Sequence, residues 1–332
     1  MSARLRHPAR EPLQHGPPDA SMHSVPQDPG RRPAGGAATW RERPEAGTVL
    51  GIRILEWIAL RLGRRALHRV LIPVTLYFLL VRGFERRASR QFLARVTDRP
   101  ASLQQIFEHF LTFARMSADR FYFLTERVGS VPVTYHGLDA LGRLVDQGRG
   151  GIFLGSHIGS FEAARCISSR HSGVVMRIVL DRAVNRKLMG RLEAMNRDFA
   201  SAVIDPEQSA AGFGLKIAEA LSDGQWVGFL ADRHRPGDRT VSCEFLGGRA
   251  KFPLGPFLIA AAFKAPDVCI FPLFIEGRYE VYFEVVSSSF TVPRQDREAR
   301  LAEYVQAYAD RLAAHVRRAP CNWFNFYDFW AD

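Results

Sequence analysis

Cysteine is scarce in this sequence, and its few cysteines have no paired spacing. The four are Cys166, Cys243, Cys269 and Cys321, and they lie far apart along the chain. Structural zinc sites use closely spaced cysteine and histidine pairs, and disulfide frameworks use many more cysteines for the chain length. We therefore expect neither, and predict a reducing compartment, no metal site and no cofactor.

The sequence also lacks an uncharged stretch long enough to cross a bilayer. Its most apolar segment, residues 70–81, is an uncharged run of 12 residues, which as a helix covers about 18 Å of a hydrocarbon core about 30 Å thick. Basic residues flank this run: Arg61, Arg64, Arg65 and Arg69 before it, and Arg82, Arg86, Arg87, Arg90 and Arg95 after it. This pattern favours attachment to an anionic lipid surface. A full span and a buried core helix are the alternatives.

Acidic residues are outnumbered by basic ones. The chain has 34 Asp and Glu against 45 Lys and Arg, a formal net charge of +11. Such a charge implies an anionic partner, which can be nucleic acid, a membrane surface, or an acidic protein or phosphate-bearing substrate. The sequence has no recognised nucleic-acid-binding module. We therefore predict an anionic membrane surface as a partner and no nucleic acid.

The chain divides by composition into three parts. Residues 1–46 hold eight of the 19 prolines without apolar periodicity, which predicts a disordered tail. The tail lacks the apolar core of roughly 7 to 15 residues that a signal peptide needs, so we expect the protein to stay on the cytoplasmic side. Residues 47–100 are predicted as a membrane-associated basic and apolar helical region, and 101–332 as the main domain, with helices over 103–126 and 138–147.

From residue 150 onward, short apolar runs alternate with helical patterns. We predict strands over residues 152–154, 174–179, 202–204, 226–230, 268–275 and 281–286, and helices over 185–196, 208–222, 256–264 and 297–316. This alternation is typical of an α/β fold with a mostly parallel central sheet flanked by helices. Active sites in such folds lie beyond the carboxyl ends of the strands.

One stretch joins a buried strand to groups suited to proton transfer. The predicted strand 152–154 leads into the turn 155–159 (GSHIG), and a helix follows with Glu162 in its first turn. A neutral imidazole can take a proton from an attacking hydroxyl, and a carboxylate can fix the tautomer and stabilise the imidazolium. We predict His157 as the general base and Glu162 as its supporting carboxylate. The alternative is that His157 merely caps the helix.

A second strand also runs into a charged turn. Residues 228–238 place Asp232 and Arg233 directly after the predicted strand 226–230, at the same edge of the sheet as His157. Asp232 can orient a substrate hydroxyl or organise its neighbours, and Arg233 can bind a phosphate or carboxylate. The alternative is a solvated charged loop.

Two further segments hold candidate anion-binding groups. Residues 247–257 bring Lys251 and Gly255 to a predicted helix start, which suits an anionic ligand. Arg177 lies in an apolar run and needs a partner, either an acidic ligand or an internal carboxylate. Arg177 and the amides near Gly159 are also candidates for stabilising an oxyanion.

Signatures of several other enzyme classes are absent. The G-x-x-x-x-G-K-[ST] phosphate loop does not occur. In the turn 155–159 a histidine takes the position where a serine hydrolase has its nucleophile. His157 and Glu162 have no third metal ligand at a typical spacing nearby.

The motif H-x-x-x-x-E at 157–162 resembles the lysophospholipid acyltransferase superfamily, and more closely its lipid A biosynthesis lauroyl/myristoyl acyltransferase branch. Arg177, the turn at Asp232, residues 252–255 and the aromatic ending 322–330 are similar to features of that branch. The likeness covers roughly residues 50–330. Arg233 departs from it, because glutamine is common there, and the aromatic ending differs in detail.

The resemblance implies a glycerolipid acyltransferase-like α/β domain behind a membrane-associated N-terminal helix, at the cytoplasmic face of the bacterial inner membrane. It implies transfer of a fatty acyl group from an acyl carrier protein or acyl-CoA thioester to a hydroxyl of a lipid or glycolipid, lipid A-like or another envelope lipid. His157 is then expected to activate the acceptor without an acyl-enzyme. Alternatives are a lysophospholipid acyltransferase and a noncatalytic membrane lipid-binding protein.

Overall fold

The computed structural model describes residues 49–125, 129–167, 173–181, 190, 196–207, 209–292 and 295–330. All of these residues belong to one compact unit, Ala38–Asp332. The predicted tail over residues 1–46 lies outside the described residues. So does the predicted helix 185–196, apart from residues 190 and 196.

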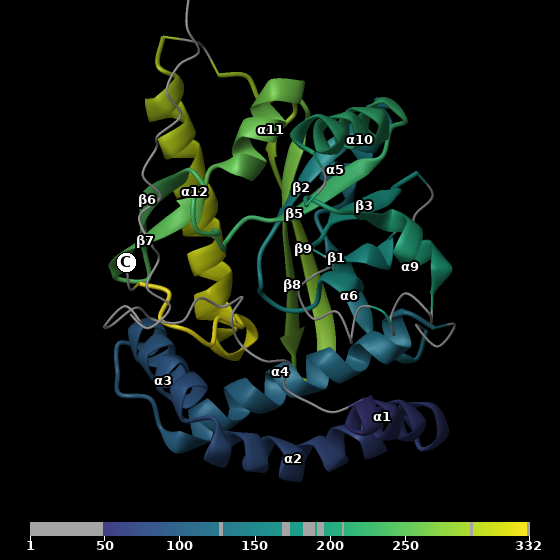
Figure 1. Cartoon of the computed structure of the whole chain (residues 1–332), viewed down its shortest axis with the longest axis vertical. Coiled ribbons are helices and arrows are strands. Elements are labelled where there is room, and N and C mark those ends of the chain that lie inside the picture. Colours follow the sequence, from purple (N-terminus) through teal and green to yellow (C-terminus); the bar gives the residue numbers. More distant parts are fainter. Residues whose placement is uncertain are drawn as a thin grey trace, which may run out of the picture. The chain divides into compact units, whose positions relative to one another are not determined.

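The described part of the chain begins with four consecutive helices, as the sequence predicts for this region. They are α1 (Val49–Arg61), α2 (Gly63–Val81), α3 (Gly83–Thr97) and α4 (Leu103–Phe123). A capping box starts α4: Ser102 Oγ accepts from the Gln105 backbone N–H at 3.1 Å, and Gln105 Oε1 accepts from the Ser102 N–H at 2.8 Å. This exchange satisfies two helix-terminal donors. In Figure 1, α4 lies across one end of the central sheet.

Seven strands form the central sheet in the part of the chain that the structure describes. Their order is β1-β9-β8-β2-β5-β3-β4. The bounds are β1 (Val133–His136), β2 (Gly151–Gly155), β3 (Met176–Val179), β4 (Val203–Ile204), β5 (Trp226–Leu230), β8 (Asp267–Ile275) and β9 (Arg278–Ser287). Neighbouring strands are parallel except β8 and β9. The predicted α/β fold with a mostly parallel sheet is confirmed.

Helices cover both faces of this sheet (Figure 1). They are α5 (Leu138–Val145), α6 (Phe161–Arg165), α9 (Arg197–Ala202), α10 (Ala210–Ser222), α11 (Gly255–Phe263) and α12 (Arg297–Arg318). On β2, Ile152 and Leu154 pack into the hydrophobic cluster that includes α10, α11 and α12, whereas Phe153 packs into the cluster that includes α5 and α6. Burial of both faces explains why this strand is apolar at every position.

A hairpin that the sequence analysis did not predict follows the central strands. It consists of β6 (Thr240–Phe245) and β7 (Gly248–Pro253), which pair antiparallel. Its two-residue turn has Leu246 at φ 50° and Gly247 at φ 74°. A leucine with positive φ is unusual. Because Leu-Gly stands where Asn-Gly or Asp-Gly usually marks such a turn, the sequence did not indicate a hairpin here. The predicted helix 256–264 is confirmed as α11 (Gly255–Phe263), but Lys251 lies in β7, a strand that the sequence analysis did not predict.

A buried ionic cluster ties the N-terminal helices to the sheet. Asp119 of α4 is fully buried and accepts two hydrogen bonds from Arg64 of α2, at 3.0 and 2.7 Å. It also binds His68 Nε2 at 2.9 Å and accepts from the Tyr279 hydroxyl of β9 at 2.8 Å. Burial favours a raised pKa for Asp119, but the bonds from His68 and Arg64 hold its pKa below the usual range. One of the arginines flanking the apolar run therefore serves an internal network.

Among the described helices, none alone has the length and hydropathy to cross a membrane. Helices α2 and α3 reach the required length and hydropathy only when taken together, and they meet at a bend of 97°.

Candidate active site

The turn that carries His157 is held by backbone contacts at the carboxyl end of β2. Gly159 has φ 66°, and a Cβ there would lie 1.3 Å from the carbonyl oxygen of Pro272, so only glycine fits. The Gly159 N–H donates to the Asn322 carbonyl at 2.8 Å, and the Phe324 N–H donates to the His157 carbonyl at 2.9 Å. The C-terminal segment thereby fixes the backbone of the turn.

His157 is paired with Asp232 rather than with Glu162. The Nδ1 atom of His157 lies 2.7 Å from Asp232 Oδ1, and the His157 backbone N–H donates to Oδ2 at 3.0 Å. The two residues meet because β2 and β5 are neighbouring parallel strands, with Gly155 opposite Leu230. A carboxylate only accepts hydrogen bonds, so Nδ1 carries the proton and Nε2 keeps its lone pair.

The charges around the pair keep the imidazole neutral and the carboxylate ionised. Burial lowers the pKa of His157, and the nearby cations Arg233 and Arg120 lower it further, against the opposing effect of Asp232. Burial favours a raised pKa for Asp232, but His157 and its hydrogen bonds, with Arg233, hold that pKa well below the usual range. A neutral imidazole that is oriented by an ionised carboxylate can act as a general base.

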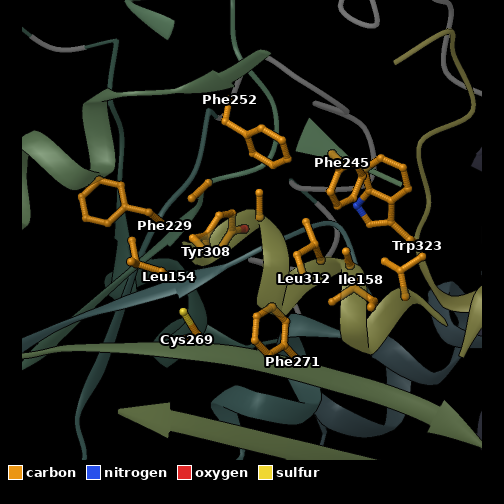
Figure 2. Close-up of a cluster of buried hydrophobic side chains, with 14 of the residues drawn as sticks. Leu154, Ile158, Phe229, Phe245, Phe252, Cys269, Phe271, Tyr308, Leu312 and Trp323 are labelled. Carbon is orange, nitrogen blue, oxygen red and sulfur yellow. The ribbon is translucent and has the colours of Figure 1, made fainter. Parts of the chain in front are cut away.

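The C-terminal segment completes the surroundings of Asp232. The Trp323 indole N–H donates to Oδ2 at 2.9 Å, and Asn325 Nδ2 lies 3.4 Å from the same oxygen. Figure 2 shows Trp323 beside Phe245 at one end of a buried cluster that also contains Ile158. The sequence analysis noted this segment only as an aromatic ending. The sequence held one signal for these donors. Asp232 directly follows an apolar strand, and an ionised carboxylate that is buried there needs several hydrogen-bond donors.

Glu162 is directed to a different partner. Its carboxylate lies 2.9 Å from Arg120 Nε of α4 and accepts from the Ser160 hydroxyl at 3.1 Å. The structure thus corrects the predicted pairing of His157 with Glu162: the carboxylate at the ring comes from the neighbouring strand, 75 residues away in sequence. Through Arg120, Glu162 ties α6 to α4. Any catalytic part for Glu162 stays a prediction.

The structure does not bring Arg177 to His157. Arg177 pairs with Val227 in the parallel ladder, five residues before Asp232, which corresponds to about 16 Å along a strand. Its guanidinium donates to Gln225 Oε1 at 2.8 Å and to the Ser201 carbonyl. The Gly159 N–H is bonded to the Asn322 carbonyl at 2.8 Å. The role of Arg177 and of the amides near Gly159 as oxyanion donors stays a prediction.

The remaining predicted anion-binding residues are divided between two places. Arg233 lies at the site, where it donates to Asn325 Oδ1 at 2.5 Å and to the Phe324 carbonyl at 2.6 Å and lies over the Tyr327 ring. Through these contacts Arg233 holds the C-terminal segment in place. Lys251 lies in β7 opposite Ser242, and Gly255 begins α11.

The described residues contain no group of three or more His, Cys, Asp or Glu side chains arranged to hold a metal ion. All four cysteines are free thiols.

Comparison with known families adds one match. A family model described as bacterial lipid A biosynthesis acyltransferase matches residues 95–331. No curated protein matches the chain. The matched range is well over half of the 332 residues and includes His157, Asp232 and Trp323.

Proposed function

Because the chain belongs to the bacterial lipid A biosynthesis acyltransferase family, and is therefore an acyltransferase that acts on lipids, we propose a specific reaction for it. The protein transfers a fatty acyl group from an acyl carrier protein or CoA thioester to a hydroxyl of a lipid or glycolipid, lipid A-like or another envelope lipid. The observation that carries this proposal is the 2.7 Å contact between His157 Nδ1 and the buried Asp232.

The chemistry follows from the state of that pair. Nε2 of His157 takes the proton of the acceptor hydroxyl while the hydroxyl oxygen attacks the thioester carbonyl carbon. The adjacent Asp232 carboxylate stabilises the imidazolium that forms. The tetrahedral intermediate then collapses, the carbon–sulfur bond breaks, and the thiolate leaves and takes the proton from Nε2. A thiolate is a good leaving group, so an acyl-enzyme is not required.

The surface of α1 and α2 supports a membrane-bound setting for this reaction. Apolar side chains are exposed along it, among them Trp57 at 57%, Tyr77 at 61% and Leu80 at 68%. Exposed arginines accompany them: Arg61, Arg65 and Arg69 on this surface, with Arg87 and Arg90 on α3. Exposed apolar patches beside basic residues are typical of helices that lie in a lipid interface. We propose that the protein acts on the cytoplasmic face of the bacterial inner membrane.

Replacement of the base tests the proposed reaction. His157→Ala removes the only group in the proposal that accepts the hydroxyl proton, so release of free thiol from acyl carrier protein or CoA thioesters should fall by roughly 10²- to 10⁴-fold. A membrane-lipid extract serves as acceptor, and mass spectrometry identifies the acylated lipid. His136→Ala is the matched control, since His136 lies in β1 and pairs with Glu280 instead.

The proposal fails if folded His157→Ala releases thiol at the rate of the wild type. It also fails if wild-type protein bound to membranes releases no thiol from either donor.

A further inference from the structure

Trp323 contacts the catalytic pair through one specific atom. Its fully buried indole donates Nε1–H to Oδ2 of Asp232 at 2.9 Å. The same oxygen accepts the His157 backbone N–H at 3.0 Å, while Oδ1 faces the imidazole at 2.7 Å. Oδ2 is thus bound by the Trp323 indole and the His157 backbone, and Oδ1 is bound by the imidazole ring of His157. The direction in which Asp232 presents Oδ1 therefore depends on the donors at Oδ2.

The indole itself has little freedom to move. Its ring centroid lies 5.2 Å from that of Phe92, 5.2 Å from Phe245 and 4.7 Å from Phe329. The Trp323 backbone is also paired with Ile158 of the His157 turn. Figure 2 shows the indole of Trp323 beside the ring of Phe245. The three phenylalanine rings therefore hold the indole N–H of Trp323 in one orientation.

A buried histidine of α4 holds the backbone of Trp323. His109 Nε2 lies 2.9 Å from the Trp323 carbonyl, and Nδ1 lies 2.8 Å from the Ser89 hydroxyl of α3. A carbonyl only accepts, so Nε2 carries the proton and Nδ1 accepts from Ser89. Both side chains are completely buried. Hydrogen bonds therefore connect α3 and α4 with Asp232 by way of Trp323.

We propose that Trp323 is a positioning residue for the general base: its indole N–H aligns Asp232 with Nδ1 of His157, and His109 of α4 holds Trp323 in place. The proposal rests on the proposed function, because it takes His157 as the base. Trp323 acts only through Asp232. The competing interpretation is that Trp323 merely fills the core, in which case its N–H is unimportant for the ring of His157.

The two interpretations differ in their effect on the proton affinity of His157. The charged groups that face the ring are Asp232, Arg233 and Arg120, and Arg120 is itself paired with Glu162. Without the indole N–H, Oδ2 loses a donor that fixes the direction of Oδ1, so Asp232 stabilises the imidazolium less strongly and the pKa of His157 falls. A base acts in its neutral form, so the low-pH limb of kcat/KM moves to lower pH.

The test is Trp323→Phe in the full-length protein, with Trp330→Phe as the matched control. Trp330 lies in the same segment, but its indole N–H donates to the Phe245 carbonyl at 3.1 Å. Trp323→Phe should lower the pKa of His157, measured by NMR on labelled histidine, by about 0.5 unit or more. It should lower kcat by about tenfold with little change in KM. Trp330→Phe should leave both unchanged.

A shape-preserving replacement covers the case in which Trp323→Phe does not fold. Benzothienylalanine at position 323 keeps the two-ring outline but has sulfur in place of N–H, and it should produce the same fall in the pKa of His157. A folded variant without the N–H that shows the wild-type pKa and kcat overturns the proposal. The NMR titration needs no substrate. If the wild-type protein releases no thiol, the proposed function is contradicted. The NMR titration still decides whether the indole N–H of Trp323 affects the pKa of His157.

Discussion

At the scale of single residues, the reactivity of His157 depends on which charges surround its ring. Asp232 and its hydrogen bond favour the imidazolium, but burial and the cations Arg233 and Arg120 outweigh them, so the pKa of His157 lies below its ordinary value of 6.5. The base is therefore already neutral at neutral pH. Asp232 retains its charge because the surrounding donors hold its pKa down.

This state predicts the pH dependence of the reaction. Activity requires the neutral imidazole, so kcat/KM should fall only as the pH drops below 6.5 and through the lowered pKa of His157. A pH–rate profile of thiol release from pH 4.5 to 9 measures this limb. A midpoint above 6.5 would show that the ring is surrounded by different charges from those in the structure.

Much of this site is predictable from local sequence, but the partner of the base is not. Gly155 and Gly159 around His157 indicate a sharp turn after a buried strand, and the structure has that turn. Spacing along the chain then points to Glu162, the nearest carboxylate. The actual partner is Asp232, because sheet order places β5 beside β2. Strand order depends on contacts distant in sequence, which one sequence does not display.

At the scale of elements, α4 links the N-terminal helices to the site. Asp119 on this helix binds Arg64 of α2, Arg120 binds Glu162 of α6, and His109 binds the Trp323 carbonyl. The amphipathic pattern over residues 103–126 predicts the helix but not these contacts. The hairpin β6–β7 was missed for a different reason, because its turn uses Leu246 with positive φ.

The buried histidine of α4 should make the stability of the protein depend on pH. Burial lowers the pKa of His109 to about 4 from its ordinary value of 6.5, so between these pH values the unfolded chain binds a proton that the folded chain does not. The free energy of unfolding should therefore decrease as the pH falls from 6.5 to 4, by about 3 kcal/mol from this group.

Denaturant unfolding of the wild type and of His109→Gln at pH 7 and pH 4.5 measures this contribution. Glutamine can still donate to the Trp323 carbonyl but does not titrate, so the variant should lose less stability on acidification than the wild type. An equal loss in both proteins would mean that His109 binds its proton in the folded state as readily as in the unfolded chain.

At the scale of the whole molecule, the exposed apolar and basic residues of α1 and α2 predict binding to lipid. Each large apolar side chain that enters the interface contributes about 1.5 to 3 kcal/mol. Trp57→Asp combined with Leu80→Asp should therefore weaken binding to anionic vesicles by at least tenfold, measured by sedimentation. Leu215→Asp is the matched control, because Leu215 is 60% exposed but lies on α10. Equal binding by all three proteins would remove α1 and α2 as the lipid-binding surface.

The most direct test of the account compares Asp232→Asn with Glu162→Gln in single-turnover transfer of an acyl group from a carrier-protein thioester to extracted lipid. Asp232 binds the imidazole and Glu162 binds Arg120. Asp232→Asn should therefore slow transfer by roughly 10²-fold or more, and Glu162→Gln by clearly less. Transfer at the wild-type rate by folded Asp232→Asn, together with loss of transfer in Glu162→Gln, would contradict the assignment of His157 and Asp232 as the reacting pair.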